Sequence, residues 1–112
     1  MGCWNDKTVR AIPTLENTWD RRIDDRIEDI LDGDARTREY AVEKCAAAAE
    51  LLGYKVFAIQ AGGQCFSSEN AADTYYKYGK STICNPNGTG DKWVNNVYYF
   101  KKGKYSATYK TH

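Results

Sequence analysis

The feature that most constrains the fold of this chain is the stretch of residues 39–67. In it, a helical pattern with one cysteine leads through a glycine into a strand, a glycine turn and a second cysteine. Alanine and glutamate, both strong helix formers, dominate residues 39–52, and the apolar residues recur at helical spacing, so that one stripe faces inward. Gly53 is placed to end the helix in the left-handed conformation.

A β-hairpin follows the predicted helix. Residues 56–59 form a short apolar run bounded by turn signals, which is typical of a buried strand. Residues 61–63, an alanine and two glycines, supply the backbone freedom for a turn, and residues 64–67 return as a second strand. We therefore predict a helix packed across a short hairpin.

The remaining segments add strands and two further helices. Residues 3–6 and 9–13 read as extended pieces, and residues 14–32 have an apolar face opposite a charged face, which predicts a second helix ended by Gly33. The charged face of residues 14–32 is interpreted as a solvated surface; an acidic metal site is the alternative. Residues 69–78 predict a short helix, residues 80–92 a loop, and residues 93–100 and 105–109 two strands joined by a hairpin turn. The predicted fold class is α+β, a small antiparallel sheet with helices packed across it.

Length and charge narrow the class of protein. The chain has 112 residues, which predicts a single domain over residues 1–112. Its net charge is +1 with acidic and basic residues intermingled, which argues against a dedicated nucleic-acid binder. No apolar run approaches the length of a bilayer span, so we expect no membrane insertion.

The four cysteines indicate the cellular compartment in which the protein works. The chain has an even number of cysteines, namely Cys3, Cys45, Cys65 and Cys84. None of them forms the closely spaced CxxC pair that usually holds structural zinc. Two disulfides in a secreted, extracellular module are the preferred interpretation; a zinc site and four buried thiols are the alternatives. Asn87 begins a glycosylation sequence that ends at Thr89.

The sequence favours binding over catalysis. The single histidine, His112, is terminal, and cysteines in disulfides are not nucleophiles. The carboxylate pairs Asp24/Asp25 and Glu28/Asp29 are available to a glycosidase-like mechanism, but nothing in the sequence buries them to raise a pKa. We therefore predict that the chain is not an enzyme and needs no cofactor.

Aromatic residues make up 13% of the chain and supply the candidate binding site. The densest cluster combines one apolar platform with hydrogen-bonding side chains: Trp93, Asp91, Asn95 and Asn96. Tyr76 is added because Tyr75, Tyr76 and Tyr78 cannot all face inward on one short helix. Such amphipathic aromatics stack on sugars or anchor a protein partner. Two alternatives remain: Trp93 packs in the core while the asparagines satisfy turn backbone, or Asp91 and Asn95 ligate calcium. We predict no metal site.

The sequence combines a Cys3-Trp4 opening, an Arg10-Ala11-Ile12 strand, a helix with Cys45, Gly53-Tyr54, the segment from Phe57 to Phe66 and a closing Val97-Tyr98. Together these motifs resemble those of a WSC-type domain, an extracellular cysteine-rich module related in shape to PAN/apple domains. Ala49 and Ser67 stand where the family has further cysteines, and the segments 17–36 and 73–81 are not typical of it.

The resemblance implies a disulfide pairing and a function. In PAN-type modules the helix cysteine bridges to the neighbouring strand, which implies Cys45–Cys65 and leaves Cys3–Cys84; sequence alone leaves the other pairings open. Several WSC-type domains bind carbohydrate, so the expected function is lectin-like glycan binding. The alternative is a protein-interaction module, adhesive or matrix-forming, that binds an extracellular protein.

Overall fold

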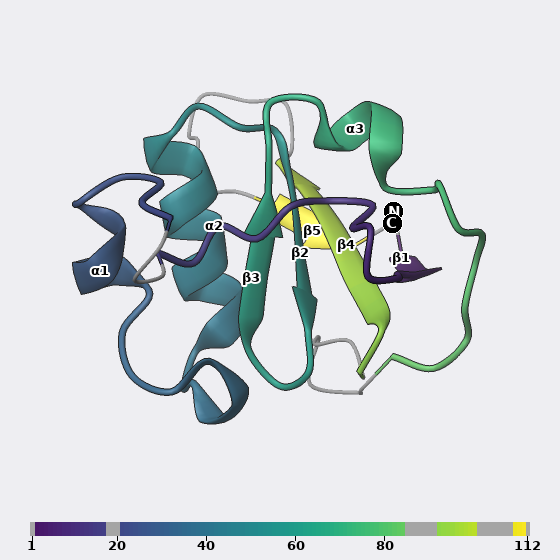
Figure 1. Cartoon of the computed structure of the whole chain (residues 1–112), viewed down its shortest axis with the longest axis horizontal. Helices are drawn as coiled ribbons and strands as arrows, with labels where there is room; N and C mark the ends of the chain where they lie inside the picture. Colours follow the sequence, from purple (N-terminus) through teal and green to yellow (C-terminus); the bar gives the residue numbers. More distant parts are fainter. Residues whose placement is uncertain (1, 18–20, 85–91, 101–108, 112) are drawn as a thin grey trace.

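The computed structural model describes residues 2–17, 21–84, 92–100 and 109–111. Within these ranges the chain forms an antiparallel sheet with helices packed against it and two disulfides, which confirms the predicted fold class. The strands are β1 (Gly2–Asn5), β2 (Val56–Gln60), β3 (Gln64–Ser67), β4 (Val94–Phe100) and β5 (Tyr109–Thr111). The helices are α1 (Ile27–Ile30), the 3₁₀-helix η1 (Ala35–Thr37), α2 (Ala41–Leu51) and α3 (Ala71–Thr74). Figure 1 shows α1 and α2 together on one side of the molecule and α3 on the other.

Strand β4 organises the sheet. One side of β4 pairs with β2, which pairs in turn with β3. On its other side, β1 pairs with residues 94–97 and β5 with residues 98–100. All these pairings are antiparallel. Residues 96–99 of β4 therefore have strands on both sides.

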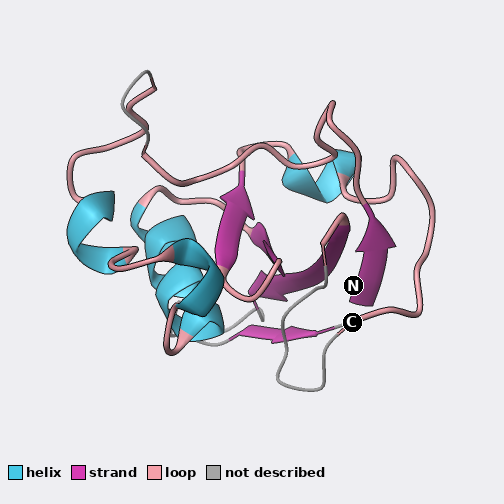
Figure 2. Ribbon diagram, turned by 60° about the horizontal axis from the view of Figure 1, so that its bottom comes forward, coloured by secondary structure: helices cyan, strands magenta, loops and turns pink. Residues whose placement is uncertain are grey.

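Strand β2 separates two hydrophobic clusters. Its five residues are all buried, as the short apolar run predicted, and alternate side chains point to opposite faces. Phe57 and Ile59 pack on the face covered by α2, and Val56 and Ala58 pack on the opposite face with Ile12. Figure 2 shows α1 and α2 on one side of the strands, with α3 lying apart from them.

Helix α2 agrees with its prediction over residues 39–52 to within two residues at each end. Its buried side is made of Ala41, Cys45, Ala46, Ala48 and Ala49; these small side chains allow the helix to approach the sheet closely. Gly53 follows the helix with a φ of 74°, as expected for the residue that ends it. Among the described residues, no helix is long and apolar enough to cross a membrane.

The prediction of a helix over residues 14–32 is wrong. Within the described part of this segment only Ile27–Ile30 is helical, and Thr14 and Leu15 instead pair with β3 through a bridge to Phe66 and a hydrogen bond to Cys65. The Asn17 side chain also bonds to the backbone of residues 23 and 24. Polar side chains that hydrogen-bond to nearby backbone groups compete with helix formation. At the start of the segment, pairing with β3 provides the backbone hydrogen bonds that a helix would otherwise have made.

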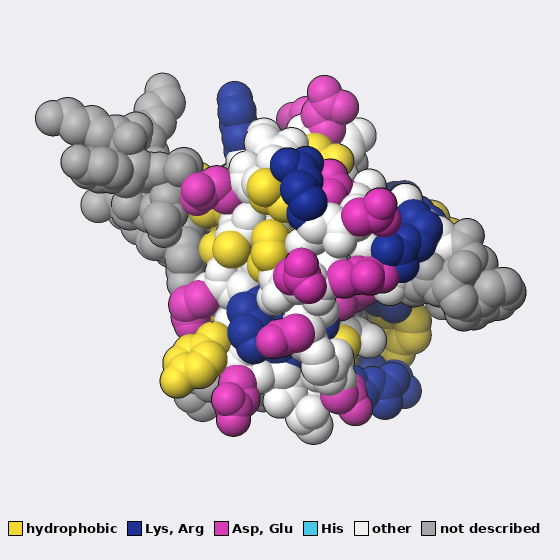
Figure 3. Space-filling view, turned by 90° about the vertical axis from the view of Figure 1, so that its left-hand side faces the viewer, with side chains coloured by type: hydrophobic (Ala, Val, Ile, Leu, Met, Phe, Trp, Pro, Cys, Tyr) yellow, Lys and Arg dark blue, Asp and Glu magenta, His cyan; other side chains and the backbone are white. Residues whose placement is uncertain are grey.

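The apolar and charged faces of this segment nevertheless separate as expected. Ile27 and Leu31 are buried in the cluster beneath α2. The charged residues form ion pairs, Arg22 with Asp25 and Glu28, and Arg26 with Asp24. Figure 3 shows the α1–α2 face of the molecule, where acidic and basic side chains are interspersed.

Both disulfide pairings implied by the resemblance are confirmed. Cys45–Cys65 joins α2 to β3 with a Cα–Cα distance of 5.4 Å, and Cys3–Cys84 joins β1 to the segment before β4 with a distance of 5.9 Å. The predicted strand at 93–100 is also confirmed. The short helix expected at 69–78 is limited to Ala71–Thr74, and most of the strand expected at 105–109 lies outside the described residues.

Candidate functional site

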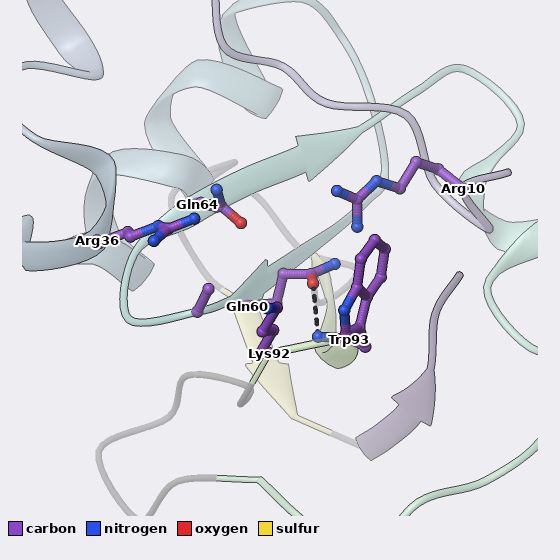
Figure 4. Close-up of a pocket in the computed structure, with 7 residues that line it drawn as sticks. Arg10, Arg36, Gln60, Gln64, Lys92 and Trp93 are labelled. Carbon is purple, nitrogen blue, oxygen red and sulfur yellow. Dashed lines mark hydrogen bonds between the residues drawn. The ribbon is translucent and has the colours of Figure 1, made fainter. Parts of the chain in front are cut away.

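A pocket of about 280 Å³ lies where the β2–β3 turn, the start of β4 and the segment after β1 meet. The pocket is lined by the end of β2 (Gln60), the turn residue Ala61 and the start of β3 (Gln64). Lys92 and Trp93, just before β4, and the side chains of Arg10 and Arg36 complete the lining. The volume of the pocket lies just below the range of about 300–1,000 Å³ that is typical of ligand sites. Figure 4 shows Arg36 and Arg10 reaching it from opposite sides, with Gln64 between them.

A buried polar network supports the pocket from below. The Asp6 carboxylate, whose side chain is fully buried, accepts hydrogen bonds from Arg10 Nη1 (2.9 Å), the Ala11 backbone N–H (2.9 Å) and Gln60 Nε2 (2.7 Å). Gln60 Nε2 also donates to Asn95 Oδ1 at 2.8 Å. Most buried polar groups in proteins are paired, and these bonds hold the Arg10 and Gln60 side chains in fixed positions; among the described residues the buried Asn95 Nδ2 atom is left without a hydrogen-bond partner.

Trp93 forms one wall and has an unusual backbone. Its φ is 61°, and its backbone N–H donates to Gln60 Oε1 at 3.1 Å, as drawn in Figure 4. The Arg10 guanidinium lies 4.7 Å from the centre of the indole ring and 5.1 Å from that of Phe66. Trp93 is nevertheless 39% exposed. A left-handed conformation at a large residue is strained and occurs disproportionately at binding sites.

The β2–β3 turn brings Arg36 to the pocket. A Cβ built at Gly62 would lie 2.1 Å from the Arg36 carbonyl oxygen, and one built at Gly63 would lie 2.4 Å from the Ala35 carbonyl oxygen. The turn therefore packs backbone to backbone against η1, which only glycine permits. The Asp34 side chain caps η1 by accepting from the Arg36 N–H at 2.9 Å. These contacts fix the backbone that carries the Arg36 side chain.

A second hollow of about 500 Å³ continues from the pocket. Arg10 and Gln64 line both, and the second is completed mainly by the segment that crosses β3: Pro13, Thr14, Glu16, Asn17, Arg21, Ala35 and Phe66. The Glu16 carboxylate is already bound, because it accepts from Arg38 at 2.7 and 2.9 Å and from the Cys65 N–H at 2.9 Å. The two hollows form one continuous surface on the β3 side of the molecule.

The structure places the predicted site residues in three different environments. Trp93 lines the pocket. Asn95 and Asn96 are 0% and 7% exposed, so the expectation that they contact a ligand directly is corrected: both side chains are buried, and Asn95 Oδ1 accepts a hydrogen bond from Gln60 Nε2. Tyr76 is 52% exposed, as expected for at least one of the three tyrosines, but it belongs to a separate aromatic group with Tyr75 and Trp4. Asp91 and Asn87 lie outside the described residues.

Sequence reasoning missed Arg10, Arg36, Gln60 and Gln64 as pocket residues. Three of them lie in the quoted motifs, Arg10 before Ala11-Ile12 and the two glutamines on either side of the 61–63 turn. A pair of glutamines flanking a glycine turn, on the same side of both strands, was a usable signal. Arg36 had none, because only the tertiary contact with Gly62 brings it there.

Comparison of the chain with protein-family models, with curated proteins and with solved structures finds no match. In the part of the chain that the structure describes, no three His, Cys, Asp or Glu side chains gather as metal ligands do. The chemistry of the pocket itself is therefore the basis for a functional conclusion. It offers an aromatic surface, amide groups and guanidinium groups, which suit non-covalent recognition.

Proposed function

We propose that this chain is an extracellular carbohydrate-binding module and that its site is the pocket beside Trp93. The observation that carries the proposal is a partly exposed indole at the edge of a small pocket with polar side chains around it. Sugars present apolar C–H faces and polar hydroxyl edges, and such a site matches both. The resemblance of the sequence motifs to WSC-type domains supports the same class of ligand.

The extracellular setting is supported by the two disulfides. Disulfides form and persist in oxidising compartments, and a domain of this size gains stability from them. Both bridges join segments distant in the sequence, with separations of 20 and 81 residues. A secreted or cell-surface module is therefore the setting in which this fold would be stable.

A protein-interaction module is the second candidate function. Tyr76 and Ile83 are 52% and 61% exposed, and Val9, whose carbonyl accepts from the Tyr78 hydroxyl, is 68% exposed. Exposed apolar side chains of this kind, when contiguous, favour protein partners. These three residues do not line the pocket, so mutations at the two places test the two functions separately.

Prediction for Trp93. We expect the oxidised protein to bind selected saccharides on a glycan array, and Trp93→Ala to weaken binding at least about tenfold, since loss of about 1.4 kcal/mol of stacking is enough for that. Trp93→Asn is a second variant, because asparagine tolerates a positive φ. Tyr76→Ala is the matched aromatic control and should bind as the parent does.

The array is read together with near-UV circular dichroism, which checks that each variant is folded. A folded parent protein that binds no saccharide would contradict the proposal, and so would binding that survives both Trp93 variants. Loss of binding in Tyr76→Ala alone would shift the assignment to the surface around α3. In that case glycan binding would stand, and its site would be the surface around Tyr76 instead of the pocket beside Trp93.

A further inference from the structure

The pocket beside Trp93 has the charge of an anion site. Of the seven described residues that line it, three are cations, namely Arg10, Arg36 and Lys92, and none of these seven is a carboxylate. The whole chain has 16 basic and 15 acidic residues, so this bias is local. The carboxylate nearest to the pocket in the network, Asp6, is buried beneath it and neutralises Arg10 in part.

Arg10 is held in a prearranged position. It lies against the rings of Phe66 and Trp93, and its Nη1 atom is paired with Asp6. Among the described residues, its Nε and Nη2 atoms have no hydrogen-bond partner within the protein. A guanidinium stacked on aromatic rings and anchored at one nitrogen loses little freedom when its remaining N–H groups bind an oxyanion.

Arg36 supplies a second guanidinium from the opposite side of the pocket, as Figure 4 shows. Its side chain is exposed and, among the described residues, makes no ion pair; the Asp34 carboxylate beside it accepts from the Arg36 backbone instead. The backbone of Arg36 is fixed against Gly62. The pocket therefore brings two guanidinium groups toward one space, with Gln64 between them.

Hydrogen-bond acceptors are scarce in the same space. The Gln60 amide is committed, because Nε2 donates to Asp6 and Asn95 and Oε1 accepts from Trp93. Among the described residues of the lining, Gln64 is the remaining side chain that carries an acceptor oxygen. A neutral hydroxyl can accept from a guanidinium, but a sulfate or carboxylate group presents only acceptors and gains the stronger, charge-assisted hydrogen bonds from Arg10 and Arg36.

We infer that the ligand of this pocket is an acidic saccharide, whose sulfate or carboxylate group is bound between Arg10 and Arg36 while a sugar ring lies against Trp93. This inference rests on the proposed glycan-binding function and specifies its ligand class. Because Arg10 and Gln64 also line the adjoining hollow of about 500 Å³, the surface accommodates an acidic chain longer than one sugar.

The experiment compares three hexasaccharides of similar length by isothermal titration calorimetry. They are a sulfated heparin-derived one, a carboxylated oligogalacturonate and a neutral chitohexaose. We expect one or both acidic probes to bind and the neutral one to bind at least about tenfold more weakly, as charge-assisted hydrogen bonds require. The ratio of the dissociation constants of the two acidic probes shows whether sulfate or carboxylate is preferred.

Arg36→Gln tests the site, because this exposed side chain is removed without disturbing the buried network. We expect it to weaken binding of the acidic probe about tenfold. Lys55→Gln is the matched control: it removes the same charge from an exposed residue at the other end of β2, and its affinity should stay within about twofold of the parent, since charges separated by more than a Debye length are screened. Affinity of the parent should fall as NaCl is raised from about 50 to about 300 mM.

The outcomes separate the two proposals. Trp93-dependent binding of chitohexaose as tight as that of the acidic probes would leave glycan binding in place and overturn the acidic ligand. Equal weakening by Arg36→Gln and Lys55→Gln would show general charge attraction and also overturn it. Binding of none of the three, with no other saccharide bound on the array, would remove both proposals.

Discussion

At the scale of single residues, Asp24 shows how the charged segment before α1 is held. Its carboxylate accepts from the Arg26 backbone N–H at 2.9 Å and from Arg26 Nε and Nη2 at 3.0 and 2.8 Å. The Arg26 side-chain hydrogen bonds are the main reason that the pKa of Asp24 is lowered from 3.8 to about 2. Asp24 and Arg26, two residues apart, thus form a bidentate ion pair just before α1.

Prediction for Asp24. A carboxyl whose pKa is lower in the folded than in the unfolded chain stabilises the fold above the unfolded pKa, and this contribution is lost as the pH falls. We expect NMR titration to place the Asp24 midpoint near 2, and Arg26→Gln to return it toward 3.8. The stabilisation disappears between about pH 4 and about pH 2.

Asp32 is the internal control for this titration. Its pKa is also lowered, chiefly by a hydrogen bond from Lys44, and Arg26→Gln should leave it unchanged. An Asp24 midpoint near 3.8 in the parent protein would show that the pair with Arg26 does not persist in solution.

At the scale of elements, the contact between the β2–β3 turn and η1 shapes the pocket. Ala61 and Gly62 have φ values of 51° and 89°, and Gly62 touches the Arg36 carbonyl so closely that no side chain fits. The Arg38 side chain reinforces the contact by donating to the Gly63 carbonyl at 2.8 Å. A short 3₁₀-helix and a hairpin turn therefore act together to position one binding residue.

Prediction for Gly62. We expect Gly62→Ala to lower the free energy of unfolding by about 3 kcal/mol, because it adds a clash with η1 backbone to the cost of a positive φ. Gly53→Ala is the control: Gly53 also has a positive φ, 74°, but a Cβ there meets nothing within 4 Å, so the loss should be about 1–2 kcal/mol. Urea unfolding measures both, and equal losses would contradict a tight turn–η1 contact.

At the scale of the whole molecule, the two disulfides cross-link different parts of the fold. Cys45–Cys65 lies in the cluster beneath α2, where both cysteines are fully buried. Cys3–Cys84 closes a loop with a sequence separation of 81 and holds β1 against the chain before β4. The first bridge belongs to the core, and the second closes a loop over most of the 112-residue chain.

Prediction for the disulfides. If a bridge stabilises by restricting the unfolded chain, the longer loop stabilises more, about 4.5 kcal/mol against about 3 kcal/mol for the shorter. The contribution of one bridge to the free energy of unfolding is measured in a variant that lacks the other bridge, by comparing its oxidised and reduced forms. The variant Cys45→Ala/Cys65→Ala reports on Cys3–Cys84, and Cys3→Ala/Cys84→Ala reports on Cys45–Cys65. A larger loss for the shorter loop, seen in urea unfolding, would contradict the expectation.

The sequence by itself determined the central helix–hairpin unit and the fold class, because the signals for them are local. The alanine stripe of α2, the glycine that ends it, the apolar run of β2 and the glycine turn each act within a few residues. These elements then pack on each other as neighbours in the chain. The resemblance added the two disulfide pairings, which local pattern could not choose.

Only the tertiary structure decided the segment 14–32 and the composition of the pocket. Thr14 and Leu15 pair with β3 rather than forming a helix, since an unsatisfied β3 edge competes successfully for their backbone groups. Asn95, which looked like a ligand residue, is buried and accepts a hydrogen bond from Gln60 in the polar network beneath the pocket. Arg10, Arg36 and Trp93, far apart in the sequence, meet only because the sheet, η1 and a buried carboxylate bring them together.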